Sequence, residues 1–297
     1  MENEAKKVNP GAKPACPICF LLGADLYTEK NGRLLYRCRG CRLIFMHPVP
    51  ADVSEIYSED YFGGARKGFG YVDYDADKIP MIPTFERYLG LIEDRRPGKG
   101  RLLDVGAATG FFMQIAEKRG WRTSGVEISP HATAVGVRKG LHIETGTLSA
   151  LDLPKGSFDA ITMFDVIEHF TDPLAEVAAA ARLLKPGGLL VVNTPDAGSV
   201  WARLLGRRWH LLVPPEHIHY FTADNLGRVL RANGFSVDLR TKIGKRFTLP
   251  YVFKMLYSWQ GWPLWRRIYE SSKGSRIGSL SMPIDLRDNL FMIAVKA

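Results

Sequence analysis

The chain has 297 residues, 46% of them hydrophobic, which is enough for one sizeable α/β core and a small additional domain. No apolar run approaches the ~20 residues of a membrane-spanning helix, and the first residues lack the basic head and apolar core of a signal peptide, so we expect a cytoplasmic protein. The formal net charge of +9 resides in the last third: residues 1–200 carry 24 Lys/Arg and 25 Asp/Glu, whereas residues 201–297 carry 16 and 6.

All four cysteines lie near the start of the chain, in two Cys-x-x-Cys pairs with eighteen residues between them: Cys16, Cys19, Cys38 and Cys41. This spacing predicts a tetrahedral Zn²⁺ site of the zinc-ribbon type, since a cytoplasmic chain is a poor place for disulfides. Four thiolates leave no open position for water, so the ion is structural. Phe20 and Arg42 stand where zinc ribbons often have glycine. The zinc-ribbon-like domain is predicted to span residues 1–50, with short strands near residue 27 and over 34–36.

Residues 51–98 form a predicted helical bridge, with one short helix over 54–62, a glycine-rich loop and a second helix over 83–94. The next domain is predicted to span residues 99–297. It opens with a buried strand at 102–105, a turn at Gly106–Gly110 and a helix from Phe111. Small residues let a ligand approach the backbone, and the first amides of the helix point at an anionic group.

Glu127 ends the next apolar run, where an acidic side chain suits the two hydroxyls of a ribose. A nucleoside-bearing ligand is therefore predicted. Asp104, Gly106, Ala108 and Gly110 differ in spacing from the Gly-x-Gly-x-x-Gly pattern of dinucleotide sites. The alternative for the turn alone is an ordinary strand–turn–helix of an α/β protein.

The rest of the chain alternates strands and helices. Helices are predicted over 129–139, 172–184 and 222–232, and further strands over 142–145, 158–164, 189–193, 235–240 and 289–295. The prediction is an α/β fold with a doubly wound, mostly parallel seven-stranded sheet. An insertion at about 242–285 is basic and aromatic, and Gly261 and Pro263 break it into short helices.

Two further stretches, residues 157–169 and 183–190, follow the glycine turn and Glu127 in an order that resembles class I S-adenosylmethionine-dependent methyltransferases over residues 99–241. The layout with a zinc ribbon resembles certain bacterial methyltransferases. The resemblance implies S-adenosylmethionine as cofactor, held by Asp104, Gly106, Ala107, Ala108, Gly110, Glu127, Ile128, Thr147, Leu148, Phe164 and Asp165. Phe164 and Asp165 would meet the methionine end and the turn at Thr147 the adenine.

Two details of this resemblance matter for the site. Ala108 replaces the middle glycine, a change that matters only if that position needs a positive φ. Thr147 stands where many relatives have an acid, which leaves the amide of Leu148 to serve the adenine ring. Helices before the first strand often cover the cofactor in this fold, so Tyr57, Tyr61 and Phe62 are candidate lid residues. Aromatic packing between the ribbon and the core is the alternative for these three.

Methyl transfer needs an aligned acceptor and, for O- or N-methylation, removal of a proton. The candidates near the active edge are His169, His217, His219 and Tyr220, with His217 first as general base. A buried structural histidine is the alternative for each. Glu168 is interpreted as a helix-start or supporting carboxylate.

We predict methylation of a small molecule, a sugar or glycan, or a lipid-linked precursor. An RNA methyltransferase is the alternative favoured by zinc and basic charge. A non-catalytic cofactor-binding scaffold recruited through the ribbon is a further alternative. The basic aromatic last third is either a lid or a peripheral contact at the inner membrane face.

Overall fold

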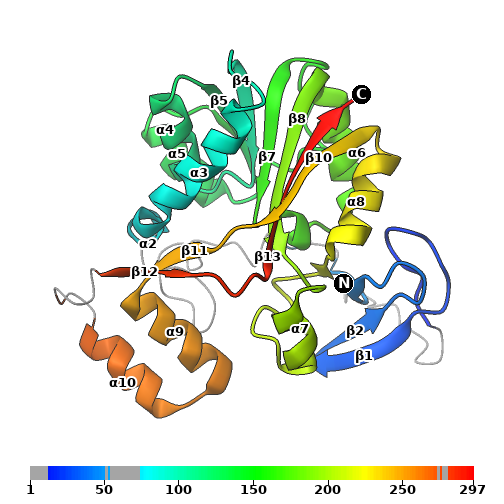
Figure 1. Cartoon of the computed structure of the whole chain (residues 1–297), viewed down its shortest axis with the longest axis vertical. Coiled ribbons are helices and arrows are strands. Elements are labelled where there is room, and N and C mark those ends of the chain that lie inside the picture. Colours follow the sequence, from blue (N-terminus) through cyan, green and yellow to red (C-terminus); the bar gives the residue numbers. More distant parts are fainter. Residues whose placement is uncertain (1–12, 51–52, 54–73, 273–274, 276–279) are drawn as a thin grey trace, which may run out of the picture.

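The computed structural model describes residues 13–50, 53, 74–272, 275 and 280–297. The candidate lid residues Tyr57, Tyr61 and Phe62 lie outside this part. The described chain is built around one large sheet, with the N-terminal ribbon and the C-terminal insertion at the same end of it (Figure 1).

The large sheet has seven strands in the order β10-β13-β8-β7-β4-β5-β6. The strands are β4 (Arg101–Val105), β5 (Arg122–Glu127), β6 (Ile143–Thr145), β7 (Phe158–Phe164), β8 (Leu184–Pro195), β10 (Phe235–Lys242) and β13 (Asn289–Lys296). Strands β4 to β8 pair in parallel, whereas β13 runs antiparallel to both β8 and β10. The predicted doubly wound, mostly parallel sheet of seven strands is confirmed.

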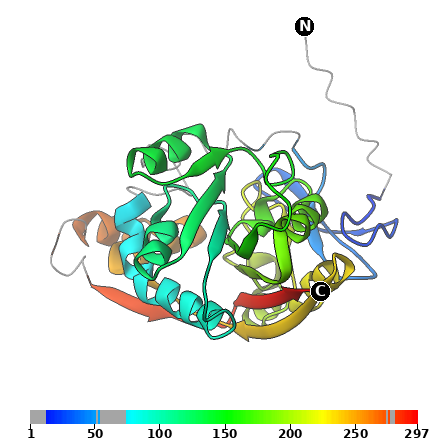
Figure 2. The same cartoon turned by 90° about the horizontal axis from the view of Figure 1, so that it is seen from above.

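Helices cover both faces of this sheet (Figures 1 and 2). One side carries α3 (Ile82–Glu93), α4 (Phe111–Lys118) and α5 (Pro130–Arg138), and the other carries α6 (Pro173–Leu183) and α8 (Ala223–Ala232). Neighbouring residues of a strand point to opposite faces. In β4, for example, Leu102 packs in the α3–α4 core and Leu103 in the α6–α8 core.

Helices α5, α6 and α8 begin directly after the first residues of the predicted helices, which act as their N-terminal caps. The side chains of Ser129, Asp172 and Thr222 each accept hydrogen bonds from the first turn of α5, α6 and α8. The strand after α6 begins earlier than the predicted residue 189, because β8 starts at Leu184 directly after the helix. Leu184 pairs with Phe158 and Leu189 pairs with Ala160. The register of β8 against β7 therefore shifts between these two pairs, as at a β-bulge.

The N-terminal ribbon forms a second, four-stranded sheet in the order β1-β2-β3-β9. Its strands are β1 (Asp25–Lys30), β2 (Arg33–Arg37), β3 (Ile44–Met46) and β9 (His219–Tyr220). Strand β9 comes from the downstream domain, and Phe45 of β3 pairs with His219. Three of the cysteines also share one core with Phe221 and Leu226. The ribbon is therefore packed onto the large domain along its edge strand.

The insertion forms an arm at the lower end of the molecule in Figure 1. It contains β11 (Lys245–Thr248) paired with β12 (Ser281–Ile284), and between them α9 (Leu249–Gln260) and α10 (Pro263–Ser272). The break between the helices falls at Gly261, whose φ is +73°, as predicted. Within the described part of the chain, no helix is both long enough and apolar enough to cross a bilayer.

The remaining short elements line the joints between these parts. They are α2 (Tyr74–Lys78), η2 (Ile79–Met81), η3 (Ile167–His169), α7 (Val200–Leu205) and η4 (Gly206–Arg208). Helix α2 belongs to the bridge, and η3 follows β7 at the carboxyl edge of the large sheet.

Candidate functional site

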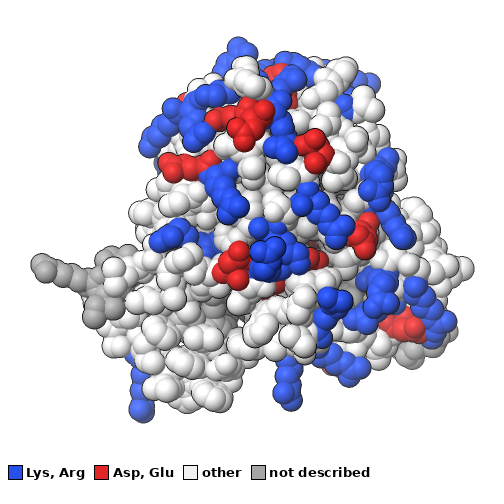
Figure 3. All heavy atoms as spheres, in the orientation of Figure 1, with Lys and Arg blue, Asp and Glu red and all other residues white. Residues whose placement is uncertain are grey.

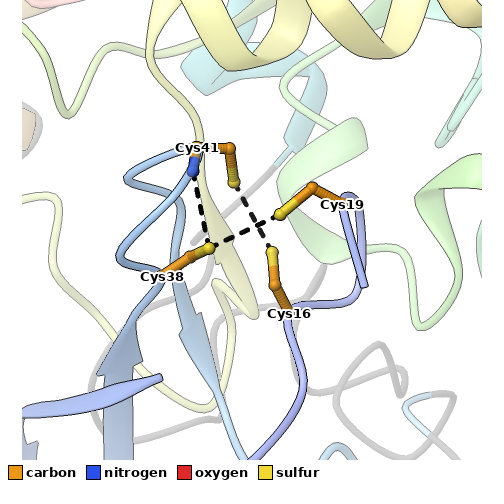
Figure 4. A group of neighbouring side chains, drawn as sticks. All are labelled: Cys16, Cys19, Cys38 and Cys41. Atoms are coloured by element: carbon orange, nitrogen blue, oxygen red, sulfur yellow. Dashed lines mark hydrogen bonds between the residues drawn. The ribbon is translucent and has the colours of Figure 1, made fainter. Parts of the chain in front are cut away.

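The four cysteines meet at one point of the ribbon, with their sulfur atoms turned toward one another (Figure 4). The Sγ atoms of Cys16 and Cys41, and those of Cys19 and Cys38, are 3.5 Å apart. Zn–S bonds of about 2.3 Å place tetrahedral sulfurs roughly 3.8 Å apart, so the four thiols fit a zinc ion. The neighbouring Cys41 thiol lowers the pKa of Cys16 to about 5, which favours the metal-binding thiolate.

The two turns of the ribbon take the conformation that glycine usually takes. Phe20 and Arg42 have φ values of +59° and +63°. The ribbon therefore keeps the backbone of a glycine-containing knuckle while using larger residues, at some local cost.

A cavity opens at the carboxyl ends of β4, β5 and β7, where open α/β sheets bind ligands. Eight of the predicted cofactor residues line it: Gly106, Ala108, Glu127, Ile128, Thr147, Leu148, Phe164 and Asp165. His169 lines it as well. Its walls thus combine the predicted cofactor residues with one of the predicted bases.

The turn after β4 has a conformation that explains its small residues. Gly106 has a φ of +74°, and a Cβ atom there would lie 2.6 Å from Cγ2 of Val166. Ala108 has a φ of +49°, so the position of the replaced glycine does need a left-handed backbone. The alanine is accommodated at a cost of roughly 1 kcal/mol. The substitution is therefore less mild than the sequence alone indicates.

The carboxylate of Glu127 is buried at the end of β5 and is held by backbone amides. Oε2 accepts from the amide of Ala108 at 2.8 Å, and Oε1 accepts from the amide of Ser129 at 2.9 Å. Burial raises the pKa of Glu127, while these amides oppose the shift. Each carboxylate oxygen has a second lone pair, so this orientation fits two ribose hydroxyls.

The turn expected at the adenine differs in its hydrogen bonding from the prediction. The amide of Leu148 donates to Oε2 of Glu176 at 3.0 Å, and the Ser149 hydroxyl donates to Oε1 at 2.5 Å. The Leu148 amide is thus occupied within the protein. Glu176, which the sequence did not single out, lines the cavity and anchors this turn.

Asp165 carries an ion pair that links the cavity to the insertion. Its carboxylate oxygens lie 2.7 and 2.6 Å from Nζ of Lys245 in β11. Although burial works against it, the ammonium groups of Lys245 and Lys78 hold the pKa of Asp165 below its usual range. Asp165 also has a φ of +52°, a strained conformation of the kind that gathers at functional sites.

The other three predicted cofactor residues, Asp104, Ala107 and Gly110, are not part of the cavity wall. Asp104 is buried and its Oδ1 accepts from the hydroxyl of Thr162 at 2.7 Å. Burial raises the pKa of Asp104 to about 7, with the Thr162 hydrogen bond opposing the shift. Ala107 and Gly110 form the backbone of the turn, and the Gly110 amide donates to the Ala107 carbonyl at 2.8 Å.

Two of the histidines come together beside the cavity. The rings of His169 and His217 are edge-on with centroids 4.9 Å apart. Nδ1 of His169 lies 2.6 Å from the carbonyl of Glu216, and Nδ1 of His217 lies 2.9 Å from the carbonyl of Leu211. Burial lowers the pKa of His169 to about 4 and that of His217 to about 3, so both rings are neutral at pH 7.

The remaining two catalytic candidates are placed in the ribbon sheet. His219 and Tyr220 form β9, are fully or almost fully buried, and pair with Phe45 and Ile44 of β3. Neither is among the residues of the cavity wall. Burial also lowers the pKa of His219 to about 4. Their surroundings are those of core side chains that hold the ribbon against the large domain.

Some residues of the site carried no local sequence signal. Lys78, Glu176 and Lys245 come from α2, α6 and β11, and they reach the cavity or Asp165 only through the tertiary fold. Thr162, the partner of Asp104, lies on β7, where its hydroxyl could be placed only once the pairing of β4 and β7 was known.

Comparisons with known proteins agree with this geometry. A family model described as "Methyltransferase domain" matches residues 81–239. The ubiquinone biosynthesis O-methyltransferase of Xanthomonas oryzae pv. oryzae (strain PXO99A) is 35% identical over 101 residues, which cover 32% of this chain and 42% of that protein. The chain thus spans less than half the length of this relative. The protein of the same name from Thiobacillus denitrificans is 29% identical over 180 residues, 56% of this chain and 78% of its own.

One solved structure shows the fold alone. The YcgJ protein from Bacillus subtilis matches with a TM-score of 0.51 at 17% identity, and the match covers 72% of this chain and 98% of that one.

Proposed function

Since the chain belongs to the methyltransferase domain family, we propose that it transfers the methyl group of S-adenosylmethionine to a hydroxyl oxygen of a small-molecule acceptor. The observation that carries the proposal is the shared cavity. Glu127 and Asp165 stand on its cofactor side, and His169 stands on the same cavity where an acceptor can enter. Two relatives are named ubiquinone biosynthesis O-methyltransferase, which supports oxygen as the methylated atom and a small molecule as the acceptor.

The residues of the cavity have distinct tasks in this proposal. Glu127 holds the ribose, and the glycine turn lets the cofactor lie against the backbone. Phe164 and Asp165 position its methionine end. When bound, S-adenosylmethionine supplies an electrophilic methyl carbon on a sulfonium. The protein then needs to align the acceptor oxygen with that carbon and to provide for its proton.

His169 is the better placed of the two neighbouring histidines. Its ring lines the cavity, whereas the ring of His217 packs against it at 4.9 Å. Because Nδ1 of His169 donates to the Glu216 carbonyl, its neutral ring carries the lone pair on Nε2. We therefore favour His169 over His217 as the group that acts on the acceptor proton. We assign His219 and Tyr220 no catalytic role.

A methyl-labelling experiment tests the function. The protein is incubated with S-adenosylmethionine labelled in its methyl group and with a cell extract separated into RNA, lipid and soluble small-molecule fractions. Label in the soluble or lipid fraction supports the proposal, and it separates free acceptors, such as sugars, from lipid-linked ones. Label in RNA contradicts it and favours an RNA methyltransferase. Cofactor binding without transfer to any fraction contradicts it in favour of a scaffold.

The insertion supports an apolar or lipid-borne acceptor. Large apolar side chains are exposed in the insertion, where Trp259 lies near the end of α9, Trp262 lies between the two helices and Leu264 lies near the start of α10. Val200 and Leu204 of α7, outside the insertion, are exposed as well. On the face shown in Figure 3, the surface over α9 and α10 is largely uncharged. Apolar helices with aromatic and basic residues suit the bilayer interface. In our proposal this end of the molecule touches a membrane surface.

Sedimentation with vesicles tests the membrane contact. The double variant Trp262→Ser and Leu264→Ser should bind anionic phospholipid vesicles at least about tenfold more weakly than the parent protein. Leu22→Ser, at a 78% exposed position of the ribbon, is the control and should bind as the parent does. Equal binding by all three proteins, or no binding by the parent, contradicts the contact.

A further inference from the structure

Three side chains meet beside the cavity in an arrangement that the proposed methyl transfer does not by itself require. Glu168 and His169 come from η3, and His217 comes from the segment before β9. One ligand atom from each, a carboxylate oxygen and two imidazole nitrogens, lie within 4.8 Å of one another. The amide of Ile218 donates to the Glu168 carbonyl at 2.8 Å, which ties the two segments together.

Both imidazoles are oriented by backbone carbonyls. A carbonyl can only accept, so Nδ1 of His169 and Nδ1 of His217 carry the protons that reach Glu216 and Leu211. In each neutral ring Nε2 is then the nitrogen with the lone pair. Histidines that bind metals typically donate their other ring N–H to a carbonyl or carboxylate in this way.

Glu168 supplies an independent sign of a missing partner. Its side chain is 2% exposed, and its Oε2 accepts from the Thr194 hydroxyl at 2.8 Å. Among the described residues, its buried Oε1 has no hydrogen-bond partner. This atom lies 3.9 Å from Nε2 of His169, too far for a hydrogen bond even if the acid were protonated. A buried carboxyl oxygen without a partner is costly whether the group is ionised or protonated, and a cation beside it would remove that cost.

We propose that Glu168, His169 and His217 bind a divalent first-row transition-metal ion beside the methyl-transfer cavity. Two histidines and one carboxylate form a known ligand set that leaves coordination positions open. Metal–ligand bonds of about 2.1 Å bring neighbouring ligand atoms to roughly 3.0–3.4 Å, so binding draws the three groups together by about an ångström. The nearby Asp165 is already paired with Lys245, which leaves Glu168 as the carboxylate that faces the ion.

The bound ion would select the class of acceptor molecule. This part of the inference rests on the proposed function. Because His169 lines the cavity, open coordination positions face the acceptor. They suit a molecule with two adjacent oxygens, such as a catechol or a vicinal diol. The ion lowers the pKa of the bound hydroxyl, whose proton passes to solvent. The oxygen forms a bond to the methyl carbon, the carbon–sulfur bond breaks with its electron pair on sulfur, and a methyl ether and S-adenosylhomocysteine result.

Binding of Mn²⁺, followed by electron paramagnetic resonance, tests the site without any acceptor. The protein is used with its cysteine site filled by zinc, since Mn²⁺ prefers nitrogen and oxygen ligands to thiolates. We expect one bound Mn²⁺ per chain. Glu168→Gln and His217→Phe should each weaken binding by more than about 100-fold, because even groups that merely support ligands contribute about 10–100-fold.

A matched control uses a similar pair on the surface. Nε2 of His142 lies 3.8 Å from Glu144, and both side chains are exposed. His142→Phe should bind Mn²⁺ as the parent does. Absence of Mn²⁺ binding by the parent protein, or equal binding by the parent and the two cluster variants, overturns the proposal.

Two further measurements keep the outcome clear. Calorimetry of S-adenosylhomocysteine shows whether each variant retains the cofactor site, so a failed metal site is distinguished from a failed methyltransferase assignment. If a variant does not fold, nuclear magnetic resonance of the parent protein decides. Mn²⁺ should then broaden the ring signals of His169 and His217 but not those of His142, and unchanged signals of the first two contradict the proposal.

Discussion

The backbone amide of Ile218 donates to the carbonyl of Glu168 at 2.8 Å, while the carbonyl of Ile218 accepts from the amide of Met46 at the same distance. One residue thus joins the ribbon strand β3 to the edge of the cavity. The arrangement of Glu168 and His217 depends on a strand pairing that the ribbon completes.

Removal of zinc from the ribbon should therefore affect the large domain as well. Purified protein should contain one zinc ion per chain, because the four thiols fit the ion and a ribbon of this size cannot bury enough surface to fold alone. Release of the metal by a thiol-reactive reagent should lower the melting temperature measured by calorimetry. Elemental analysis that finds no zinc, together with four free thiols in protein kept under reducing conditions, would falsify the metal assignment.

Replacement of Glu127 should abolish most of the cofactor affinity. Glu127→Ala removes a carboxylate that can accept from both ribose hydroxyls, so binding of S-adenosylhomocysteine should weaken by on the order of 2–4 kcal/mol. Isothermal calorimetry measures the change. Glu144→Ala, at a partly exposed position of β6, serves as the control and should bind normally. Normal binding by Glu127→Ala as well would remove Glu127 from the site.

Two substitutions in the turn after β4 should affect stability to different extents. Gly106→Ala places a methyl group 2.6 Å from Val166 at a φ of +74°, which should destabilise the protein by roughly 1–3 kcal/mol. Ala108→Gly relieves a left-handed alanine but makes the unfolded chain more flexible, so the free energy of unfolding should change by less than about 1 kcal/mol. Urea denaturation compares the two variants. Equal stability of both would show that the turn tolerates a side chain at either position.

The ion cluster around Asp159 should make stability depend on acid pH. Although burial opposes it, hydrogen bonds from Lys185, the Arg101 amide and Arg96 lower the pKa of Asp159 from 3.8 to about 2. A lowered pKa contributes stability above the unfolded value, and this is lost as the pH falls from about 4 to about 2. By linkage the contribution at pH 7 is about 2 kcal/mol.

Chemical denaturation of Asp159→Asn at several pH values checks this window. The variant should be less stable than the parent at pH 7, and the difference should shrink toward pH 2. Asp152→Asn, at an exposed position, is the matched control. A difference that stays constant down to pH 2 would mean that the ionised carboxylate is not what stabilises the fold.

Local signals in the sequence were sufficient for most of the large sheet. Ser129, Asp172 and Thr222 begin helices as predicted because a capping side chain acts on amides within its own turn. The cysteine spacing and the glycine turn are likewise local patterns. The cavity wall at Gly106 and Glu127 therefore emerged at the carboxyl ends of the predicted strands.

Features that depend on contacts between residues far apart in the sequence could not be predicted from local patterns. Strand β9 has two residues and is defined by its partner β3 rather than by its own pattern, so the sequence predicted His219 and Tyr220 as catalytic candidates near the active edge. Lys245 and Asp165 are 80 residues apart in the sequence. The Leu148 amide was expected to serve the adenine because Thr147 replaces an acid, and its actual acceptor, Glu176, lies 28 residues further along the chain in α6.

The arm formed by β11, α9, α10 and β12 has a consequence for any attempt to shorten the enzyme. It projects from the body of the molecule and resembles a surface extension that could be trimmed (Figure 1). Yet its first strand begins with Lys245, the cation that meets Asp165. A chain that lacks the arm would keep the whole seven-stranded sheet, yet Asp165, in its strained left-handed backbone, would lose the ammonium group that it pairs with directly and keep only Lys78 nearby. The ion pair of Lys245 and Asp165 thus joins the arm to the wall of the cavity, so the two parts can be redesigned only together.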